Sequence, residues 1–132
     1  MRALIIDDDP VTRLYFEEIL SPHADTRAAA SGAEGVEAFR QARGEGRPFQ
    51  AVLVDICMPG MDGHQALQQI RSLEQKAGLS LDEQTAVFMV SSMDDAQNVN
   101  RAFFQGGAIG YLTKPVSPEV LVAELSKFGL IP

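Results

Sequence analysis

The amino-acid sequence predicts an α/β fold, a doubly wound five-stranded parallel sheet with helices on both faces. The first observation is that apolar segments of strand length alternate with segments whose apolar residues recur at helical spacing. The second is that this alternation implies crossover connections, which join parallel strands and cover both faces of a sheet. A chain of 132 residues also suits one compact domain, residues 1–132.

The N-terminal segment predicts the first strand and helix. Ala3–Ile6 is a continuous apolar run, and Asp9 followed by Pro10 supplies an N-cap and a proline at the first helical position. The helix is expected to end at Ser21-Pro22. Its apolar residues at helical spacing are expected to face the sheet, namely Val11, Leu14, Tyr15 and Ile19.

The second predicted strand, Asp25–Ala29, consists of polar and small residues. Ser31 and Glu34 follow it at the spacing of a capping box, in which each side chain accepts a backbone N–H of the helix start. This spacing predicts a second helix. Val36 and Phe39 are expected to point inward from it.

The third strand is Ala51–Val54, whose apolar, β-branched residues suit a central position, and it ends directly at Asp55. The third helix follows, with an apolar face of Ala66, Leu67, Ile70 and Leu73. A polar loop, Ala77–Gln84, leads to the fourth strand, Ala86–Val90, which ends at Ser91.

The remaining segment predicts one more strand between two helices. Asp94 or Asp95 can cap a fourth helix, with Ala96, Val99 and Phe103 on its apolar side. The fifth strand is Ala108–Leu112, and Ser117-Pro118 repeats the arrangement of cap and proline at a helix start. The last helix has an apolar stripe of Leu121, Leu125 and Phe128.

Composition and charge restrict the possible partners. The formal charge of −7 disfavours direct binding to nucleic acids and to anionic membranes. The single cysteine, Cys57, excludes an internal disulfide framework and suits a reducing compartment. No apolar run is long enough to span a bilayer or to form the core of a signal peptide. We therefore expect a cytoplasmic protein that does not enter membranes.

Polar residues stand at the ends of four predicted strands. Asp7 and Asp8 follow the first strand, Asp55 the third, Ser91 the fourth and Lys114 the fifth. In an open parallel sheet these ends meet at one edge, where ligands bind. Gathered carboxylates repel one another unless a hard cation neutralises them, and a hydroxyl and an ammonium suit phosphoryl oxygens. The pattern indicates phosphoryl transfer with a carboxylate as nucleophile.

These residues resemble the response-regulator receiver domains of two-component signalling, over nearly the whole chain. Three segments in the same order carry the resemblance: Ile5–Pro10 is similar to the acidic turn of the family, Val54–Gly63 to its phosphoacceptor loop, and Gly107–Pro115 to its terminal signature. The resemblance implies a flavodoxin-like sheet with strand order 2-1-3-4-5. It also implies a phosphoacceptor signalling domain rather than an enzyme acting on separate substrates.

By position, the resemblance assigns the phosphoacceptor to Asp55. It assigns Mg²⁺, or Mn²⁺, to oxygens of Asp8, Asp55 and the backbone carbonyl of Cys57, with Asp7 acting through a water. Ser91 and Lys114 are expected to contact the incoming phosphoryl group, and Ser91 and Tyr111 to be the switch residues. The Lys114-Pro115 peptide bond is expected to be cis.

The same resemblance implies a histidine kinase or phosphotransfer protein as the phosphoryl donor. The phosphorylated form would then bind an unknown downstream protein or pass the phosphoryl group on. Cys57 and Met93 are expected to flank the path to the phosphoryl group. Since both side chains hydrogen-bond weakly, they should orient an attacking water poorly, and self-catalysed dephosphorylation should be slow.

Three alternatives remain open from the sequence. Asp7–Val11 formally fits the nucleophile motif of haloacid-dehalogenase-like phosphatases, although Lys114 follows Asp94-Asp95, the reverse of the order in that family. A flavodoxin-like flavin binder rests on fold analogy alone, and an acidic loop would repel the flavin phosphate. A degenerate receiver that only binds partners should lack a site residue, and none is missing.

Overall fold

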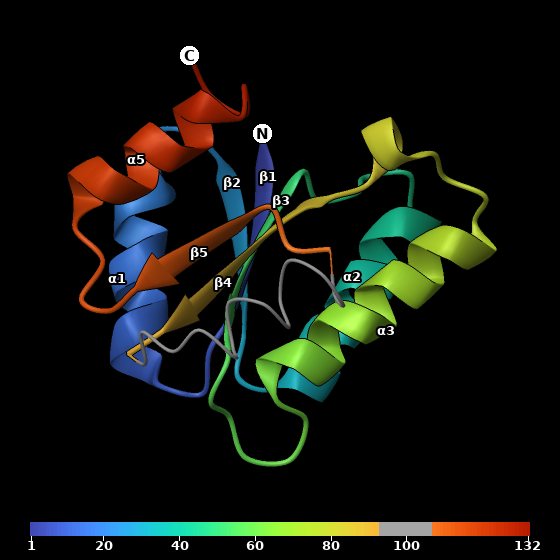
Figure 1. Cartoon of the computed structure of the whole chain (residues 1–132), viewed down its shortest axis with the longest axis horizontal. Coiled ribbons are helices and arrows are strands. Elements are labelled where there is room, and N and C mark those ends of the chain that lie inside the picture. The colour runs from blue at the N-terminus through green and yellow to red at the C-terminus, as the bar shows by residue number, and fades with distance from the viewer. Residues whose placement is uncertain (93–106) are drawn as a thin grey trace.

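The computed structural model describes residues 1–92 and 107–132 and contains a five-stranded parallel sheet (Figure 1). The strand order is β2-β1-β3-β4-β5, as the resemblance implies. The strands are β1 (Arg2–Ile6), β2 (Asp25–Ala29), β3 (Ala51–Asp55), β4 (Ala86–Ser91) and β5 (Gly110–Thr113). β1 and β3 are neighbours, so the residues that follow them lie side by side.

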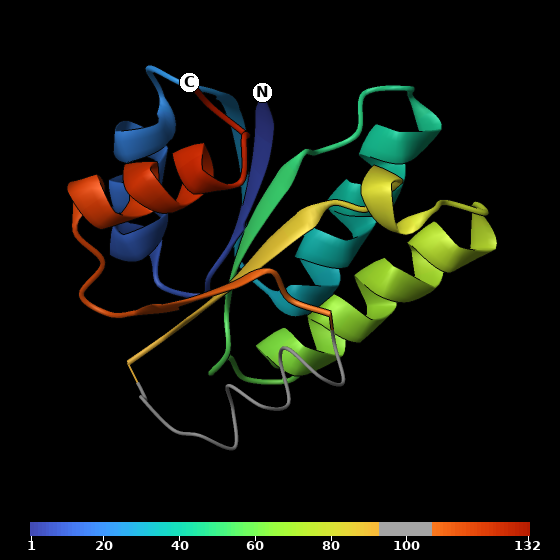
Figure 2. The ribbon, with the colours of Figure 1, turned by 45° about the horizontal axis from the view of Figure 1, so that its top comes forward.

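Helices cover both faces of the sheet. In Figures 1 and 2, α1 and α5 lie on one face and α2 and α3 on the other. Their bounds are α1 (Pro10–Leu20), α2 (Gly32–Gly44), α3 (Gly63–Lys76) and α5 (Pro118–Lys127). The predicted fourth helix falls in residues 93–106, outside the described part of the chain.

Two apolar cores result, one under each helical layer. The first packs α2 and α3 on the sheet through Phe39, Ala66, Leu67 and Ile70, and the second packs α1 and α5 through Phe16, Leu20, Leu121 and Leu125. The predicted inward residues of α2, α3 and α5 are confirmed, with Val36, Leu73 and Phe128 partly buried at the core margins. Each strand is thus fixed from both faces, and the strand ends form a rigid platform for side chains.

The buried stripe of α1 differs from the predicted one. Val11 is 73% and Leu14 58% exposed, while Phe16 and Leu20 are buried. Ile19 is partly buried as expected. The periodicity of apolar residues allowed two stripes on this helix, since Phe16 and Leu20 are also four residues apart. The sheet takes the stripe of Phe16 and Leu20, and it leaves Val11, Leu14 and part of Tyr15, which is 39% exposed, in solvent.

Smaller differences concern element ends. β5 starts two residues later than predicted, at Gly110, and a 3₁₀ turn (Leu81–Glu83) interrupts the predicted loop. Ser31 caps α2 by accepting the Glu34 N–H, but Glu34 in turn accepts the N–H of Ala30 rather than that of Ser31. Among the described residues, no helix is long and apolar enough to cross a membrane.

Candidate functional site

Three carboxylates meet at the carboxyl ends of β1 and β3. One oxygen each from Asp7, Asp8 and Asp55 lies within 4.8 Å of the others. Asp7 and Asp55 are buried and Asp8 is exposed, so the cluster opens to solvent on one side. The pairing of Ile6 with Val54 in the sheet puts the next residue of each strand at the same level. The predicted convergence of these residues is confirmed.

Local hydrogen bonds fix the turn between β1 and α1. Asp7 Oδ1 accepts the Asp9 N–H at 2.9 Å, and Asp9 in turn caps α1 by accepting the Val11 N–H at 3.0 Å. Arg13 reaches back from the first turns of α1 and donates from Nη1 to the Asp7 carbonyl at 2.8 Å. These bonds restrain the Asp7-Asp8 backbone and use Oδ1 of Asp7, while Oδ2 of Asp7 faces Lys114.

The turn after β3 is fixed by its own contacts. Asp55 Oδ1 accepts the Cys57 N–H at 3.3 Å. Gly63 begins α3 directly against the end of β3, and a Cβ at this position would lie 2.5 Å from the Asp55 carbonyl oxygen. Only glycine permits this close approach. Asp62 and Gln65 form a capping box that starts α3 at this point.

Lys114 brings a positive charge to the cluster from β5. Its Nζ lies 3.1 Å from Asp7 Oδ2 and 3.5 Å from Asp55 Oδ2. Its backbone N–H donates to the Ser91 carbonyl at 2.8 Å, which continues the ladder between β4 and β5. The Lys114-Pro115 bond is cis, as predicted.

The acidic cluster of Asp7, Asp8 and Asp55 carries more negative charge than the Lys114 ammonium neutralises. Burial raises the pKa of the Asp55 carboxyl, the charge of Asp7 raises it further, and Lys114 opposes both. Burial acts to lower the pKa of Lys114, but its hydrogen bond to Asp7 and the charge of Asp55 outweigh this, so the pKa is raised. The ammonium therefore stays charged at neutral pH, and one positive charge faces three carboxylates.

The donor set of the cluster fits a hard divalent cation. Carboxylate and carbonyl oxygens are the ligands that Mg²⁺ prefers, and its sites in proteins use one or two carboxylates with open positions. The exposed Asp8 and the excess of negative charge both satisfy this description. A cation here would offset the repulsion that raises the pKa of Asp55.

The other predicted site residues are placed as follows. Ser91 is fully buried at the end of β4, and Tyr111 on β5 is partly buried against the first core. Cys57 is exposed and contacts Asp55 through its N–H; a role for its carbonyl stays a prediction. Met93 lies outside the described residues.

Sequence reasoning missed three contacts of charged or polar side chains. Arg13 holds the acidic turn, Tyr15 donates to the Val116 carbonyl at 2.7 Å, and a buried pair of Arg71 and Glu74 joins α3 to β4. Arginine and glutamate three apart on a helix normally indicate a solvent-exposed pair. A single sequence contains no signal that would distinguish the buried case.

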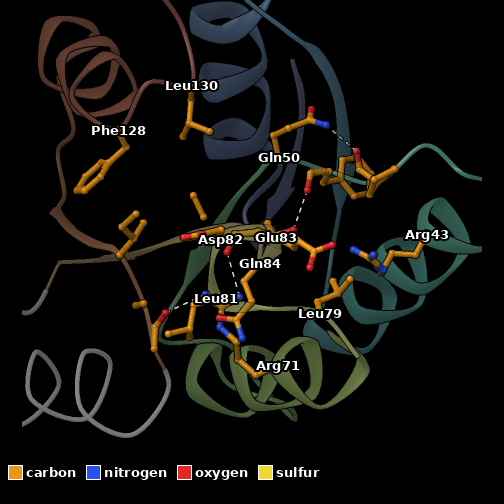
Figure 3. Close-up of a pocket in the computed structure, with 17 residues that line it drawn as sticks. Arg43, Gln50, Arg71, Leu79, Leu81, Asp82, Glu83, Gln84, Phe128 and Leu130 are labelled. Carbon is orange, nitrogen blue, oxygen red and sulfur yellow. Dashed lines mark hydrogen bonds between the residues drawn. The ribbon is translucent and has the colours of Figure 1, made fainter. Parts of the chain in front are cut away.

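The structure also contains a groove of about 710 Å³ at the opposite, amino end of the sheet (Figure 3). Phe128 and Leu130 border it from the chain around α5, and Arg43 and Arg71 from the helices on the other face. None of the predicted site residues lines this groove. The candidate site is therefore the acidic cluster.

Comparison with known proteins agrees with this geometry. Residues 3–126 match the family described as the response regulator receiver domain. The chain belongs to this family. Receiver domains are the signalling modules of two-component systems, and the resemblance on which the strand order was predicted is confirmed.

Curated relatives include whole regulators and parts of longer sensors. The chain is 31% identical to the two-component response regulator ORR41 of rice over 130 residues, which is 98% of this chain and 95% of that protein. It is also 31% identical to the protein PilH of Pseudomonas aeruginosa over 127 residues. The sensor protein GacS of Pseudomonas syringae is 33% identical over 129 residues, but the chain spans only 13% of its length.

Solved structures show the same fold. The chemotaxis protein CheY4 of Vibrio cholerae superposes with a TM-score of 0.80 at 23% identity, covering 96% of each chain. The CheX-CheY-BeF3-Mg²⁺ complex of Borrelia burgdorferi gives a TM-score of 0.79 at 26% identity, covering 97% of this chain and 89% of that one. That relative has been seen with Mg²⁺ and with a protein partner.

Proposed function

We propose that this receiver domain accepts a phosphoryl group on Asp55 in the presence of a divalent cation. One observation carries the proposal: the buried Asp55 carboxylate lies beside those of Asp7 and Asp8 and 3.5 Å from the Lys114 ammonium. Asp55 is the carboxylate of the cluster that stands at the end of β3, the middle strand of the sheet.

The metal would be Mg²⁺ or Mn²⁺, held by Asp8, Asp55 and the Cys57 carbonyl, with Asp7 reaching it through a water. When bound, such a cation supplies positive charge that neutralises the carboxylates and the phosphoryl oxygens. Asp7 is well placed for an indirect role, since one of its oxygens accepts the Asp9 N–H and the other pairs with Lys114.

In the reaction, an Asp55 oxygen attacks the phosphorus of the donor in line with the bond that breaks, and the donor leaves with the bonding electrons. Lys114 and the Ser91 hydroxyl are proposed to bind the phosphoryl oxygens as charge shifts. Both sit at the ends of neighbouring strands that a backbone hydrogen bond holds together. Hydrolysis of the acyl phosphate would follow by in-line attack of water, and a slow rate stays the prediction from Cys57 and Met93.

The test is intact-protein mass spectrometry after incubation with acetyl phosphate and Mg²⁺. Wild type should gain one phosphoryl group, Asp55→Asn none, and omission of Mg²⁺ should suppress the wild-type reaction. Asp25→Asn is the matched control, because Asp25 is an exposed carboxylate at the start of β2. Undiminished labelling of Asp55→Asn would refute the assignment of the phosphoacceptor.

The proposed donor is a phosphorylated histidine of a kinase or phosphotransfer protein, docked on α1. Val11 and Leu14 form an exposed apolar pair on this helix, which we call the α1 apolar patch. An apolar hollow of about 430 Å³ continues the patch toward Lys114 and is lined by Val11, Pro115 and Val116. A partner covering this surface would bring its histidine to the open side of the acidic cluster.

Leu14→Ala tests this docking surface. Transfer from a phosphorylated phosphotransfer domain that labels wild type should slow about fivefold, because an apolar contact of the interface is lost. Labelling by acetyl phosphate should be unchanged. Leu81→Ala, an exposed leucine at the opposite end of the sheet, is the control and should alter neither rate. Equal transfer to wild type and Leu14→Ala would rule out docking through the patch.

A further inference from the structure

Helix α1 contacts both backbone segments that carry the charges of the acidic site, the turn with Asp7 and Asp8 and the segment with Lys114. It follows the turn that bears Asp7 and Asp8, and Arg13 from this helix holds the Asp7 carbonyl. In Figures 1 and 2 the connection from β5 to α5 runs beside α1. Lys114, the positive half of the site, begins that connection. The relative position of the two halves therefore depends on how α1 is joined to this connection.

Tyr15 makes that junction. Its hydroxyl donates to the Val116 carbonyl at 2.7 Å, a bond between residues 101 positions apart in the chain. Its ring packs beside Phe16, with the ring centroids 5.7 Å apart, and lines the apolar hollow together with Pro115 and Val116. The Val116 carbonyl lies beyond Thr113, the last β5 residue paired with β4 in the described part of the chain, and the tyrosine supplies a hydrogen bond to it.

The hydrogen bond from Tyr15 restrains the backbone on the C-terminal side of Lys114. On the N-terminal side, the Lys114 N–H is bonded to Ser91 of β4 at 2.8 Å. Two residues later, the Val116 carbonyl is bonded to Tyr15 of α1, and the Val116 side chain is buried. The lysine backbone is thus anchored once to the sheet and once to the helix that follows the acidic turn. Its side chain reaches Asp7 and Asp55 from this anchored origin.

We infer that Tyr15 is a positioning residue for Lys114, whose ammonium it keeps aimed at the carboxylates and at the phosphoryl group that Asp55 receives. The inference rests on the proposed function. A lysine side chain is a flexible stem, and the position of its backbone sets which of its conformations bring the ammonium within reach of the carboxylates. Charge stabilisation of a transferring phosphoryl group depends on such placement, and loss of alignment costs rate rather than metal binding.

Tyr15→Phe is the direct test, because it removes the hydroxyl and keeps the ring in the hollow. Labelling by acetyl phosphate is measured over a range of Mg²⁺ concentrations, which separates the maximal rate from the Mg²⁺ concentration at half-saturation. The small donor avoids any effect on protein docking. We expect the maximal rate to fall about three- to tenfold while half-saturation is unchanged. The hydrogen bond and the ring contact of Tyr15 are with Val116 and Phe16, and neither residue is a proposed metal ligand.

Ile19→Val is the matched control for packing on the same helix. Ile19 is partly buried against the second core and lies one turn farther from the site. The Ile19→Val substitution should lower thermal stability without lowering the maximal rate of labelling by acetyl phosphate. Equal rates for Tyr15→Phe and wild type overturn the inference, as do equal losses in Tyr15→Phe and Ile19→Val, or a change confined to Mg²⁺ half-saturation. Failure of wild type to be labelled would instead overturn the proposed function.

Discussion

Glu74 and Asp55 are both buried carboxylates, at opposite ends of the sheet and with different partners. Glu74 is fully buried; Arg71 Nη1 lies 2.6 Å from one of its oxygens, and the Thr85 N–H donates to the other at 2.6 Å. Asp55 has one N–H donor at 3.3 Å and an ammonium at 3.5 Å that is shared with Asp7. The first carboxylate is neutralised by the fold, and the second is left with a deficit of positive charge.

Glu74 therefore belongs to a structural ion pair, whereas Asp55 belongs to a site that suits a cation. Besides Glu74, Arg71 binds the Thr85 carbonyl at 3.0 Å and the Gly107 carbonyl at 2.8 Å, so one side chain joins α3, the start of β4 and the chain entering β5. Figure 3 shows Arg71 at the groove that these segments border. At the carboxyl ends of β1 and β3, the carboxylates of Asp7, Asp8 and Asp55 repel one another, and binding a cation would reduce this repulsion.

Glu74→Ala should have the largest effect on stability. It leaves the Thr85 N–H without its acceptor, and it leaves the largely buried Arg71 guanidinium with two carbonyl acceptors but no counter-charge. We expect the free energy of unfolding to fall by about 3 kcal/mol. Urea denaturation of the metal-free protein measures this change. Phosphorylation of the folded fraction should persist, because Glu74 lies at the end of the sheet away from Asp55.

The control is the other glutamate and arginine pair at the same spacing. Glu37 and Arg40 of α2 are also three residues apart, but their side chains are 50% and 59% exposed. Glu37→Ala should leave the free energy of unfolding nearly unchanged, because water screens such pairs. Equal losses in the two variants would show that burial does not distinguish them.

The fold and the acidic cluster could be predicted because local signals and topology agree. Asp9-Pro10 and Ser117-Pro118 start helices as predicted. Asp7, Asp8 and Asp55 meet because the neighbouring parallel strands β1 and β3 bring their carboxyl ends to one edge, and the long side chain of Lys114 reaches them from the end of β5.

Contacts between distant segments could not be predicted in this way. The burial of Glu74 depends on Thr85 and the groove beside it, and Tyr15 meets Val116 only once α1 has placed its other stripe on the sheet. The exposure of Val11 and Leu14 has the same origin. Helical spacing defines candidate faces, but the neighbouring elements select which face is buried.

Asp55→Asn should have a smaller effect than Glu74→Ala, and it should raise the free energy of unfolding of the metal-free protein rather than lower it. Because the pKa of Asp55 is raised in the folded protein, the folded state binds a proton more readily than the unfolded state. Ionisation of Asp55 therefore disfavours folding, and stability falls as the pH rises from near the ordinary value of 3.8 through the raised pKa. The asparagine variant cannot ionise and avoids this fall.

At neutral pH and without metal, Asp55→Asn should be the more stable protein by about 0.5–2 kcal/mol, the usual scale for relief of unfavourable charge. The advantage should vanish at pH 3, where wild-type Asp55 is protonated in both states. Saturating Mg²⁺ should reduce or reverse it, because a bound cation stabilises the wild-type carboxylate most. Urea denaturation of both proteins in EDTA and in Mg²⁺, at pH 3 and pH 7, separates these contributions. A less stable variant at pH 7 in EDTA would mean that Lys114 already compensates Asp55, as Arg71 compensates Glu74.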